Sequence, residues 1–505
     1  MNVAESKKLL MNKLLASAIL IALQLLLVSL AYFYLKSSVI LKWLFRLTSV
    51  AVVIFLVAKE EASSYKIIWI VLIIFFPFVG GILYVFLGNK KPAKKLRNAF
   101  DQQNEQIELN RLNNDLISKI PDEDIRGQLT YLKNQGFTTC YGQNIQYFSS
   151  GEAAFEPLLK ALKNARKYIF MEFFIVEEGY MFDTILTILK QKAKEGVEVR
   201  MMYDDVGSLT KLPRKYYQEL EKYGIQSVAF NPFVPVISLA MNNRDHKKIV
   251  VIDGVIGFSG GFNLADEYIN KVERFGYWKD SGIMLQGQAV WSLTMMFLAS
   301  WNATLNTTED YHRYFPQQSG FNQRDGLVVA YTDSPLDSEQ VGEIVYLNMI
   351  NQAHRYIYIS SPYLILDDLL QNALINAAAR GVDVRIVTPA IPDKKIVFKV
   401  TRSYYHVLIE HGVHIYEYSP GFIHAKNFLA DDRCATVGTI NLDYRSLYLH
   451  FENGIYLYDC ACLKDMKADF MDIFAKSHEM TLEEVVKKKF KGFLEVLLRV
   501  IAPLL

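Results

Sequence analysis

Two stretches of the sequence repeat one chemical pattern and decide the fold. Residues His246–Asp253 read HKKIVVID, and residues His424–Asp431 read HAKNFLAD. Both follow the pattern H-x-K-x4-D, and a Gly-[Gly/Thr]-x-Asn sequence follows each, ending at Asn263 in the first copy and at Asn441 in the second. The apolar run before each Asp is typical of a strand, and Asp253-Gly254 is a strong turn signal. The pattern therefore predicts a β-hairpin in each copy.

The sequence upstream of each copy is also repeated. A helical pattern lies between Ala165–Phe170 (ARKYIF) and Gly196–Arg200 (GVEVR), and another lies between Ala353–Tyr358 (AHRYIY) and Gly381–Arg385 (GVDVR). Strand, helix and strand in this order are typical of a parallel βαβ unit. The copies lie about 180 residues apart, far more than a solenoid repeat. We therefore expect an α/β protein with a duplicated domain.

The spacing of His and Lys indicates how each copy could act on an anion. Side chains at positions i and i+2 of a strand share a face, so His246 projects beside Lys248, and His424 beside Lys426. The ammonium group can hold an anion while the imidazole attacks it or transfers a proton. Lysine is not a metal ligand at neutral pH, and no H-E-x-x-H motif or acidic cluster occurs. We therefore expect neither a metal nor another cofactor.

Amide and carboxylate side chains complete the predicted site. Asn263 and Asn441 would add N–H donors from the neighbouring strand. A histidine base usually needs a carboxylate on its other ring nitrogen to fix the tautomer. A shared acid-polar-Gly-Ile pattern aligns Asp280 with Glu452, which makes these two the candidates. The alternative for each is a surface salt bridge.

Composition sets limits on the class of protein. The chain has 505 residues, enough for two or three domains, and 51% of them are hydrophobic, which excludes disorder. Its net charge of +2 is too balanced to indicate nucleic-acid binding. Four cysteines without a CxxC pair form neither a disulfide framework nor a zinc motif.

Apolar runs near the N-terminus predict a membrane anchor of two or three helices. Leu14–Leu35 and Ile67–Leu87 are uncharged and long enough for the roughly 20 residues that span a bilayer. Val39–Ala58 is apolar but carries Lys42 and Arg46, so it is the uncertain third span. A cleaved signal peptide is disfavoured because the first run is too long and lacks a small-x-small exit.

The distribution of basic residues predicts the orientation of the chain. Five basic residues follow the last apolar run: Lys90, Lys91, Lys94, Lys95 and Arg97. Basic residues near span ends favour the cytoplasmic side. We therefore expect a multi-pass protein of the cell membrane whose large C-terminal part is cytoplasmic, whether two or three helices cross the bilayer.

The two H-x-K-x4-D strings resemble the HKD motifs of the phospholipase D superfamily, and nearly the whole chain resembles its bacterial cardiolipin synthases. Specific local matches are Trp69–Gly88, Trp278-Lys279-Asp280, Ser361-Pro362-Tyr363, Asn441–Ser446 and the ending Pro503-Leu504-Leu505. Gly261 stands where many superfamily members have Ser, although the synthase branch commonly has Gly. Asp253 and Asp431 belong to the named motif, but they end their strands at a turn, so we expect them to support the structure and not to carry protons.

The resemblance implies the architecture and the boundaries of its parts. It implies two phospholipase D-like αβα sandwich halves that share one active site. We assign residues 1–90 to the transmembrane anchor, 91–140 to a cytoplasmic linker, 141–320 to the first half, and 321–505 to the second half with its C-terminal helix. Neither the resemblance nor the residues indicate the oligomeric state.

The resemblance also implies a mechanism. One histidine would attack phosphorus to form a phosphohistidine, and the other would protonate the leaving alkoxide and then deprotonate the incoming alcohol. Family precedent favours His246 as the nucleophile, although the sequence is symmetric. The two lysines and the two asparagines would hold the non-bridging oxygens.

The implied reaction is phosphatidyl transfer between two phosphatidylglycerol molecules, which gives cardiolipin and glycerol. The motifs alone do not choose between this reaction, a phospholipase that uses water, and another phosphatidyltransferase. An inactive lipid-binding scaffold is a further alternative, which the two intact His-Lys pairs disfavour.

The C-terminal sequence predicts an amphipathic helix. Thr481 and Glu484 form a capping-box pattern, and apolar residues recur at helical spacing from Phe490 to Ile501, with lysines mostly off that face. Such a helix suits an anionic membrane surface. An apolar stripe that packs on the catalytic core is the equal alternative.

Overall fold

A computed structural model describes residues 39–59, 63–76, 80–81, 83–84, 88, 94–233, 239–316, 324–337, 339–487, 498–499 and 502. The predicted span Leu14–Leu35 lies outside these residues, as does part of Ile67–Leu87. Two helices, α2 (Val39–Ala58) and α3 (Ser63–Phe75), form in the predicted anchor. Of the helices that the structure describes, none combines the length and the apolar character needed to cross a bilayer.

The first half is built on a sheet of seven strands. Its strands are β2 (Gln146–Phe148), β3 (Tyr168–Phe173), β4 (Glu198–Asp204), β5 (Gln226–Phe230), β6 (Ile249–Ile252), β7 (Ile256–Gly260) and β9 (Gly282–Gln286). Their order in the sheet is β2-β9-β7-β6-β3-β4-β5. Strands β3 and β4 are parallel, and α8 (Tyr180–Lys194) connects them. This confirms the first predicted βαβ unit.

The second half repeats this order within a sheet of nine strands. Its strands are β1 (Cys140–Tyr141), β10 (Leu327–Asp333), β11 (Tyr356–Ser360), β12 (Asp383–Pro389), β13 (His414–Tyr418), β15 (Asn427–Ala430), β16 (Cys434–Gly438), β17 (Glu452–Tyr458) and β18 (Ser477–Glu479). Their order is β1-β10-β17-β16-β15-β11-β12-β13-β18. The run β17-β16-β15-β11-β12-β13 repeats β9-β7-β6-β3-β4-β5, so the duplication is confirmed at the level of topology.

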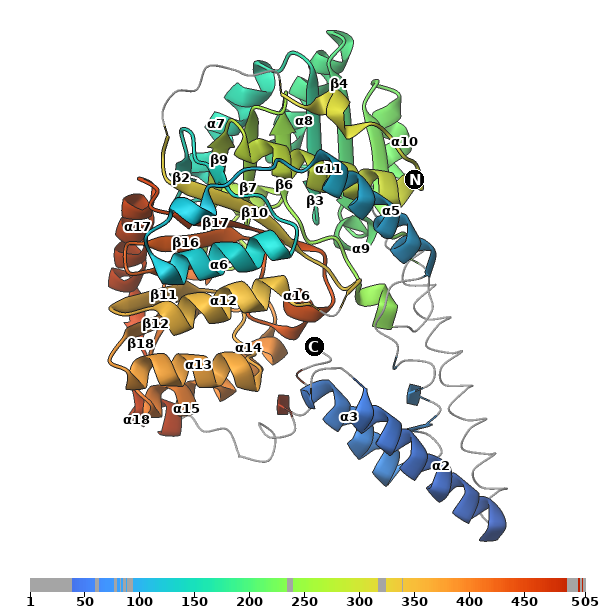
Figure 1. Cartoon of the computed structure of the whole chain (residues 1–505), viewed down its shortest axis with the longest axis vertical. Coiled ribbons are helices and arrows are strands. Elements are labelled where there is room, and N and C mark those ends of the chain that lie inside the picture. The colour runs from blue at the N-terminus through green and yellow to red at the C-terminus, as the bar shows by residue number, and fades with distance from the viewer. Residues whose placement is uncertain are drawn as a thin grey trace.

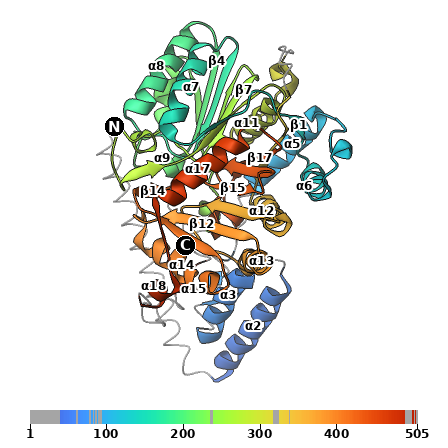
Figure 2. The ribbon, with the colours of Figure 1, turned by 90° about the vertical axis from the view of Figure 1, so that its left-hand side faces the viewer.

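Helices cover both faces of each sheet, as in an αβα sandwich. On the outer faces lie α6 (Glu123–Asn134), α7 (Gly151–Lys163), α8, α10 (Tyr216–Glu221), α12 (Val341–Gln352), α13 (Asp368–Ala379), α14 (Lys395–Ser403) and α15 (Tyr405–Glu410). On the inner faces lie α11 (Ala289–Leu305) and α17 (Leu463–Ala475) (Figures 1 and 2). One hydrophobic core joins these two inner helices to strands of both sheets. The halves therefore share a core and form one body.

Both predicted hairpins form, and the aspartates that end the motifs hold their turns. Asp253 and Asp431 have positive φ angles of 54° and 59°, the left-handed backbone that tight hairpin turns require. The Asp253 carboxylate accepts hydrogen bonds of 2.7 to 2.9 Å from three backbone N–H groups, those of Arg166, Lys167 and Tyr168. Asp431 binds the N–H groups of His354, Arg355 and Tyr356 in the same way. Each aspartate thus ties its hairpin to the start of β3 or β11.

The predicted linker is largely helical. In α5 (Lys94–Asn110), Gln103 donates a hydrogen bond to the Thr307 carbonyl at 3.1 Å and accepts one from the Tyr311 hydroxyl at 2.8 Å. Helix α6 packs on α12, and β1 adds to the edge of the second sheet. Buried contacts of these residues attach the segment to both halves.

The C-terminal segment is described only in part. The predicted capping box forms at the start of α18 (Leu482–Lys487), where Glu484 accepts a hydrogen bond from the Thr481 N–H at 3.0 Å. Most of the predicted apolar stripe lies outside the described residues. At the far end, the Arg499 Nε donates to the Ser403 hydroxyl at 3.2 Å, and Ala502 is buried in the core of the second half. The described end of the segment therefore packs on protein.

Candidate active site

The two H-x-K segments meet at the boundary between the halves. Each lies just before the ladder of its own sheet, because β6 begins at Ile249 and β15 begins at Asn427. The expectation that these segments belong to the strands was therefore wrong. Their backbones bind the opposite half, since the His246 N–H donates to the Phe451 carbonyl at 2.8 Å and the His424 N–H donates to the Lys279 carbonyl at 2.6 Å. A two-stranded sheet adds to the contact of the His424 segment with the first half. It is formed by β8 (Tyr277–Lys279) and β14 (Gly421–Ile423).

Each histidine contacts a carboxylate from the other half. The His246 Nδ1 lies 2.8 Å from the Glu452 Oε2, and the His424 Nδ1 lies 2.7 Å from the Asp280 Oδ2. Both carboxylates are fully buried, so neither is a surface salt bridge. Because Nδ1 is engaged in each ring, Nε2 is the nitrogen available to another molecule. Each motif histidine therefore takes its carboxylate partner from the opposite half.

Burial sets the charge state of these pairs. It lowers the pKa of His246 to about 3 and that of His424 to about 4, and each partner carboxylate opposes the shift only in part. Burial would raise the pKa of both carboxyl groups, but their histidine partners lower it below the usual range. At neutral pH both imidazoles are therefore neutral and both carboxyl groups are ionised.

The two motif lysines lie in equivalent places. The Lys248 Nζ donates to the carbonyl of His246 at 2.6 Å, and the Lys426 Nζ donates to the carbonyl of His424. Burial lowers the pKa of Lys248 to about 8 and that of Lys426 to about 7. These ammonium groups are poorly solvated, so an arriving anion would stabilise their charge.

The two asparagines have protein partners. The Asn263 Oδ1 accepts from the Ile175 N–H at 3.0 Å, and its Nδ2 donates to the Tyr268 hydroxyl at 2.7 Å. The Asn441 Nδ2 donates to the Ser446 hydroxyl at 3.0 Å. The phosphate-binding role of these asparagines stays a prediction, because both amides would have to share or exchange these bonds.

Sequence reasoning missed the aromatic and imidazole rings around the histidines. Tyr268, Trp278 and Phe422 lie within 6 Å of His424, measured between ring centroids. Phe174 and His450 lie 5.0 Å and 5.5 Å from His246. A signal was present for two of them, because Trp278 precedes Asp280 by two positions and His450 precedes Glu452 by two. These rings help to bury both histidines.

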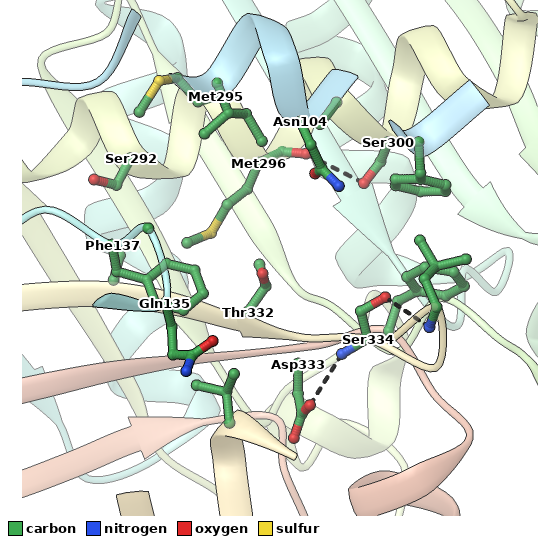
Figure 3. Close-up of a pocket in the computed structure, with 18 of the residues that line it drawn as sticks. Asn104, Gln135, Phe137, Ser292, Met295, Met296, Ser300, Thr332, Asp333 and Ser334 are labelled. Atoms are coloured by element: carbon green, nitrogen blue, oxygen red, sulfur yellow. Dashed lines mark hydrogen bonds between the residues drawn. The ribbon is translucent and has the colours of Figure 1, made fainter. Parts of the chain in front are cut away.

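Lys247, between the two motif residues, points away from the site as the alternation predicts. Its Nζ is buried and lies 2.6 Å from both Glu172 and Asp245. It lines a cavity of about 300 Å³, together with Met295 and Met296 of α11 and Thr332 and Asp333 of β10 (Figure 3). Ala425 occupies the equivalent position in the second half. Because Lys247 lines this cavity and points away from the site, the cavity lies on the far side of the H-x-K backbone.

Comparison with known sequences finds relatives along almost the whole chain. The family described as "Cardiolipin synthase, PLD-like domain" matches residues 158–280 and 346–474, and "Phospholipase_D-nuclease N-terminal" matches residues 47–89. A cardiolipin synthase of Alkalihalophilus pseudofirmus is 34% identical over 469 residues, which is 91% of this chain and 93% of the relative. One of Staphylococcus aureus is 35% identical over 466 residues, with 88% and 92% covered.

A further relative and a solved structure extend this result. An uncharacterized protein of Streptococcus mutans is 43% identical over 458 residues, with 90% of this chain and 99% of the relative covered. The crystal structure of a phosphatidylserine synthase from Haemophilus influenzae has a TM-score of 0.56 at 15% identity, covering 75% of this chain and 98% of that one, which shows a shared fold. The family match, the relatives and the paired H-x-K segments agree: this chain belongs to the cardiolipin synthase family of phospholipase D-like proteins.

Proposed function

We propose that the protein is a phosphatidyltransferase that joins two phosphatidylglycerol molecules into cardiolipin and releases glycerol. The observation that carries the proposal is the pair of His-Lys units at one boundary, each with a carboxylate from the opposite half. Two equivalent units suit a reaction whose two steps exchange one alcohol for another on the same phosphorus. The similarity to cardiolipin synthases over about nine-tenths of the chain supports the choice of substrates.

In the first step, the Nε2 of His246 attacks phosphorus in the donor lipid. The new P–N bond replaces the P–O bond to glycerol, and the imidazolium of His424 gives its proton to the glycerol oxygen. In the second step, the neutral His424 takes the proton of the acceptor's hydroxyl, and that oxygen displaces His246 from phosphorus. The two displacements return both rings to their starting states, which is covalent catalysis with general acid–base assistance.

The site must gain a proton when the lipid binds. Burial keeps both imidazoles neutral before the lipid binds, yet the first step requires His424 as an acid. A phosphodiester carries one negative charge, which raises the pKa of nearby imidazole and ammonium groups. The two lysines would hold the non-bridging oxygens, with the amides of Asn263 and Asn441 as further donors. This positive charge serves the purpose that a metal serves in other phosphoryl-transfer sites.

The N-terminal segment would hold the site at the lipid surface. On the paired helices α2 and α3, large apolar side chains such as Trp43, Leu47 and Phe75 are exposed. The pair lies at one end of the molecule beside the second half, where the Tyr444 hydroxyl donates to Ser64 at 2.8 Å (Figures 1 and 2). We propose a multi-pass anchor in the cell membrane, with the catalytic halves on the cytoplasmic side, as the basic residues after the last apolar run indicate.

The direct test uses the purified full-length protein with phosphatidylglycerol as the only lipid. We expect cardiolipin and glycerol in equal amounts, and at least about 100-fold less of both from His246→Ala or His424→Ala. Phosphatidic acid in place of cardiolipin would show that water is the acceptor, and the protein would then be a hydrolase. Absence of both products from the wild-type protein would favour the inactive scaffold and contradict the proposal.

A further inference from the structure

The two halves differ at the position that precedes each carboxylate by two residues. In the first half this residue is Trp278, whose Nε1 lies 3.4 Å from the Asp280 Oδ2. In the second half it is His450, whose Nδ1 lies 3.5 Å from the Glu452 Oε1. Both side chains thus face the carboxylate that contacts the opposite histidine. Indole is only a hydrogen-bond donor, whereas imidazole can also bind a metal.

Three potential metal ligands gather around His450. The His450 Nδ1 and the Glu452 Oε1 are both buried, and neither makes a hydrogen bond within the described part of the chain. Ligand atoms of His246, His450 and Glu452 all lie within 4.8 Å of one another. The His450 Nδ1 and the Glu452 Oε1 face each other as an ion pair at 3.5 Å, close to the roughly 3.3 Å between two ligand atoms on one tetrahedral zinc ion.

We propose that His246, His450 and Glu452 form a binding site for a divalent transition metal such as zinc. Two imidazoles and one carboxylate are a common three-residue zinc set, whereas magnesium and calcium prefer oxygen ligands only. The cation would not meet a net positive charge, because Glu452 and Asp280 balance Lys248 and Lys426 around the site. Trp278 cannot ligate a metal, so the described residues around His424 offer no equivalent ligand set.

Metal binding here would inhibit the enzyme, a consequence that rests on the proposed function. Zinc would bind the Nδ1 of His246, which requires the proton on that nitrogen to leave. The same neutral ring would gain a proton on Nε2 from solvent, so the lone pair that attacks phosphorus would be lost. The metal would also take Glu452 from its contact with His246. The site would therefore be a regulatory or toxic site, and not part of the catalytic cycle.

The first measurement is equilibrium dialysis of the metal-free full-length protein against zinc, without lipid. We expect about one zinc per chain, and binding at least about tenfold weaker in His450→Asn, because a ligand is lost. His450→Trp copies the first half and should bind equally weakly. His411→Asn is the matched control, since His411 is exposed and its Nδ1 contacts its own helix at the Val407 carbonyl.

These outcomes decide the proposal whether or not the enzyme makes cardiolipin. Undiminished zinc binding in both His450 variants, or none in the wild type, would overturn it. The inhibitory role has its own test, in which zinc lowers the wild-type rate, a chelator restores it, and His450→Asn resists the metal relative to its own zinc-free rate. One bound zinc with an unchanged wild-type rate would overturn that role. Equal inhibition by magnesium would contradict the assignment of a transition metal.

Discussion

The two halves carry the same reactive groups in different surroundings. His424 is enclosed by aromatic rings, and the neighbouring indole faces its partner carboxylate. His246 has a second imidazole near its carboxylate, and Lys247 beside it is buried in an ion-paired cluster where the other half has Ala425. The two halves thus hold similar reactive units in chemically distinct surroundings. Such a difference is needed if one histidine is to be the nucleophile and the other the acid and base.

The largest expected effect comes from removing either histidine. His246→Ala and His424→Ala should each lower cardiolipin formation by at least about 100-fold, because each ring performs a step that no other group can perform. With a labelled donor lipid, His424→Ala should retain label covalently bound to protein, while His246→Ala should not. Label retained only in His246→Ala would exchange the roles of the two halves. A single variant that keeps more than about a tenth of the activity would contradict the two-histidine mechanism.

The crossed carboxylates give the next largest effect. Glu452→Gln and Asp280→Asn should each lower the rate by about 100- to 10,000-fold, because the neutral amide no longer fixes the tautomer or stabilises the imidazolium. Histidine-labelled NMR separates crossed pairing from pairing within a half. Glu452→Gln should shift the ring signals of His246, and Asp280→Asn those of His424. The opposite assignment would show that each half is complete by itself.

The pH dependence of the reaction rate should reflect the protonation of the buried Lys426. Burial lowers the pKa of Lys426 to about 7, so the empty site loses this positive charge as pH rises through about 7. We expect kcat/KM, which reports the free enzyme, to fall above that pH. The fall in kcat should come at higher pH, because the bound phosphodiester stabilises the ammonium group. A kcat/KM that stays level to pH 9 would show that Lys426 is charged in the empty site or is not needed.

The smallest effect on activity is expected at the aspartates that end the two motifs. Asp253→Asn and Asp431→Asn keep a residue that tolerates the positive φ angle but remove the charge that three N–H groups share. We expect each to lower the free energy of unfolding by about 1–3 kcal/mol, while the rate per folded molecule stays within about twofold. Thermal unfolding and activity of the same samples separate these effects. Loss of activity without loss of stability would place these residues in the chemistry.

Much of the site was predictable because repeated local patterns carry it. His246 and Lys248, and their counterparts His424 and Lys426, follow from spacing, and Asp280 and Glu452 follow from aligning the two copies. Which histidine each carboxylate contacts was not predictable. Aligning the two copies with each other does not show which residues of one copy contact the other. His450 was also missed, because its place two positions before Glu452 gains a meaning only once the structure shows that it faces that carboxylate.

The sequence by itself determined the α/β class, the duplication, the hairpins and the identity of the reactive groups, because these depend on residues close together in the chain. Only the tertiary structure decided that the H-x-K segments leave their own sheets, that Glu452 contacts His246 while Asp280 contacts His424, and that the rings are neutral in the empty site. The physical reason is that these features arise at the boundary between the halves. There, burial and hydrogen bonding depend on residues far apart in the chain, and local periodicity does not encode such contacts.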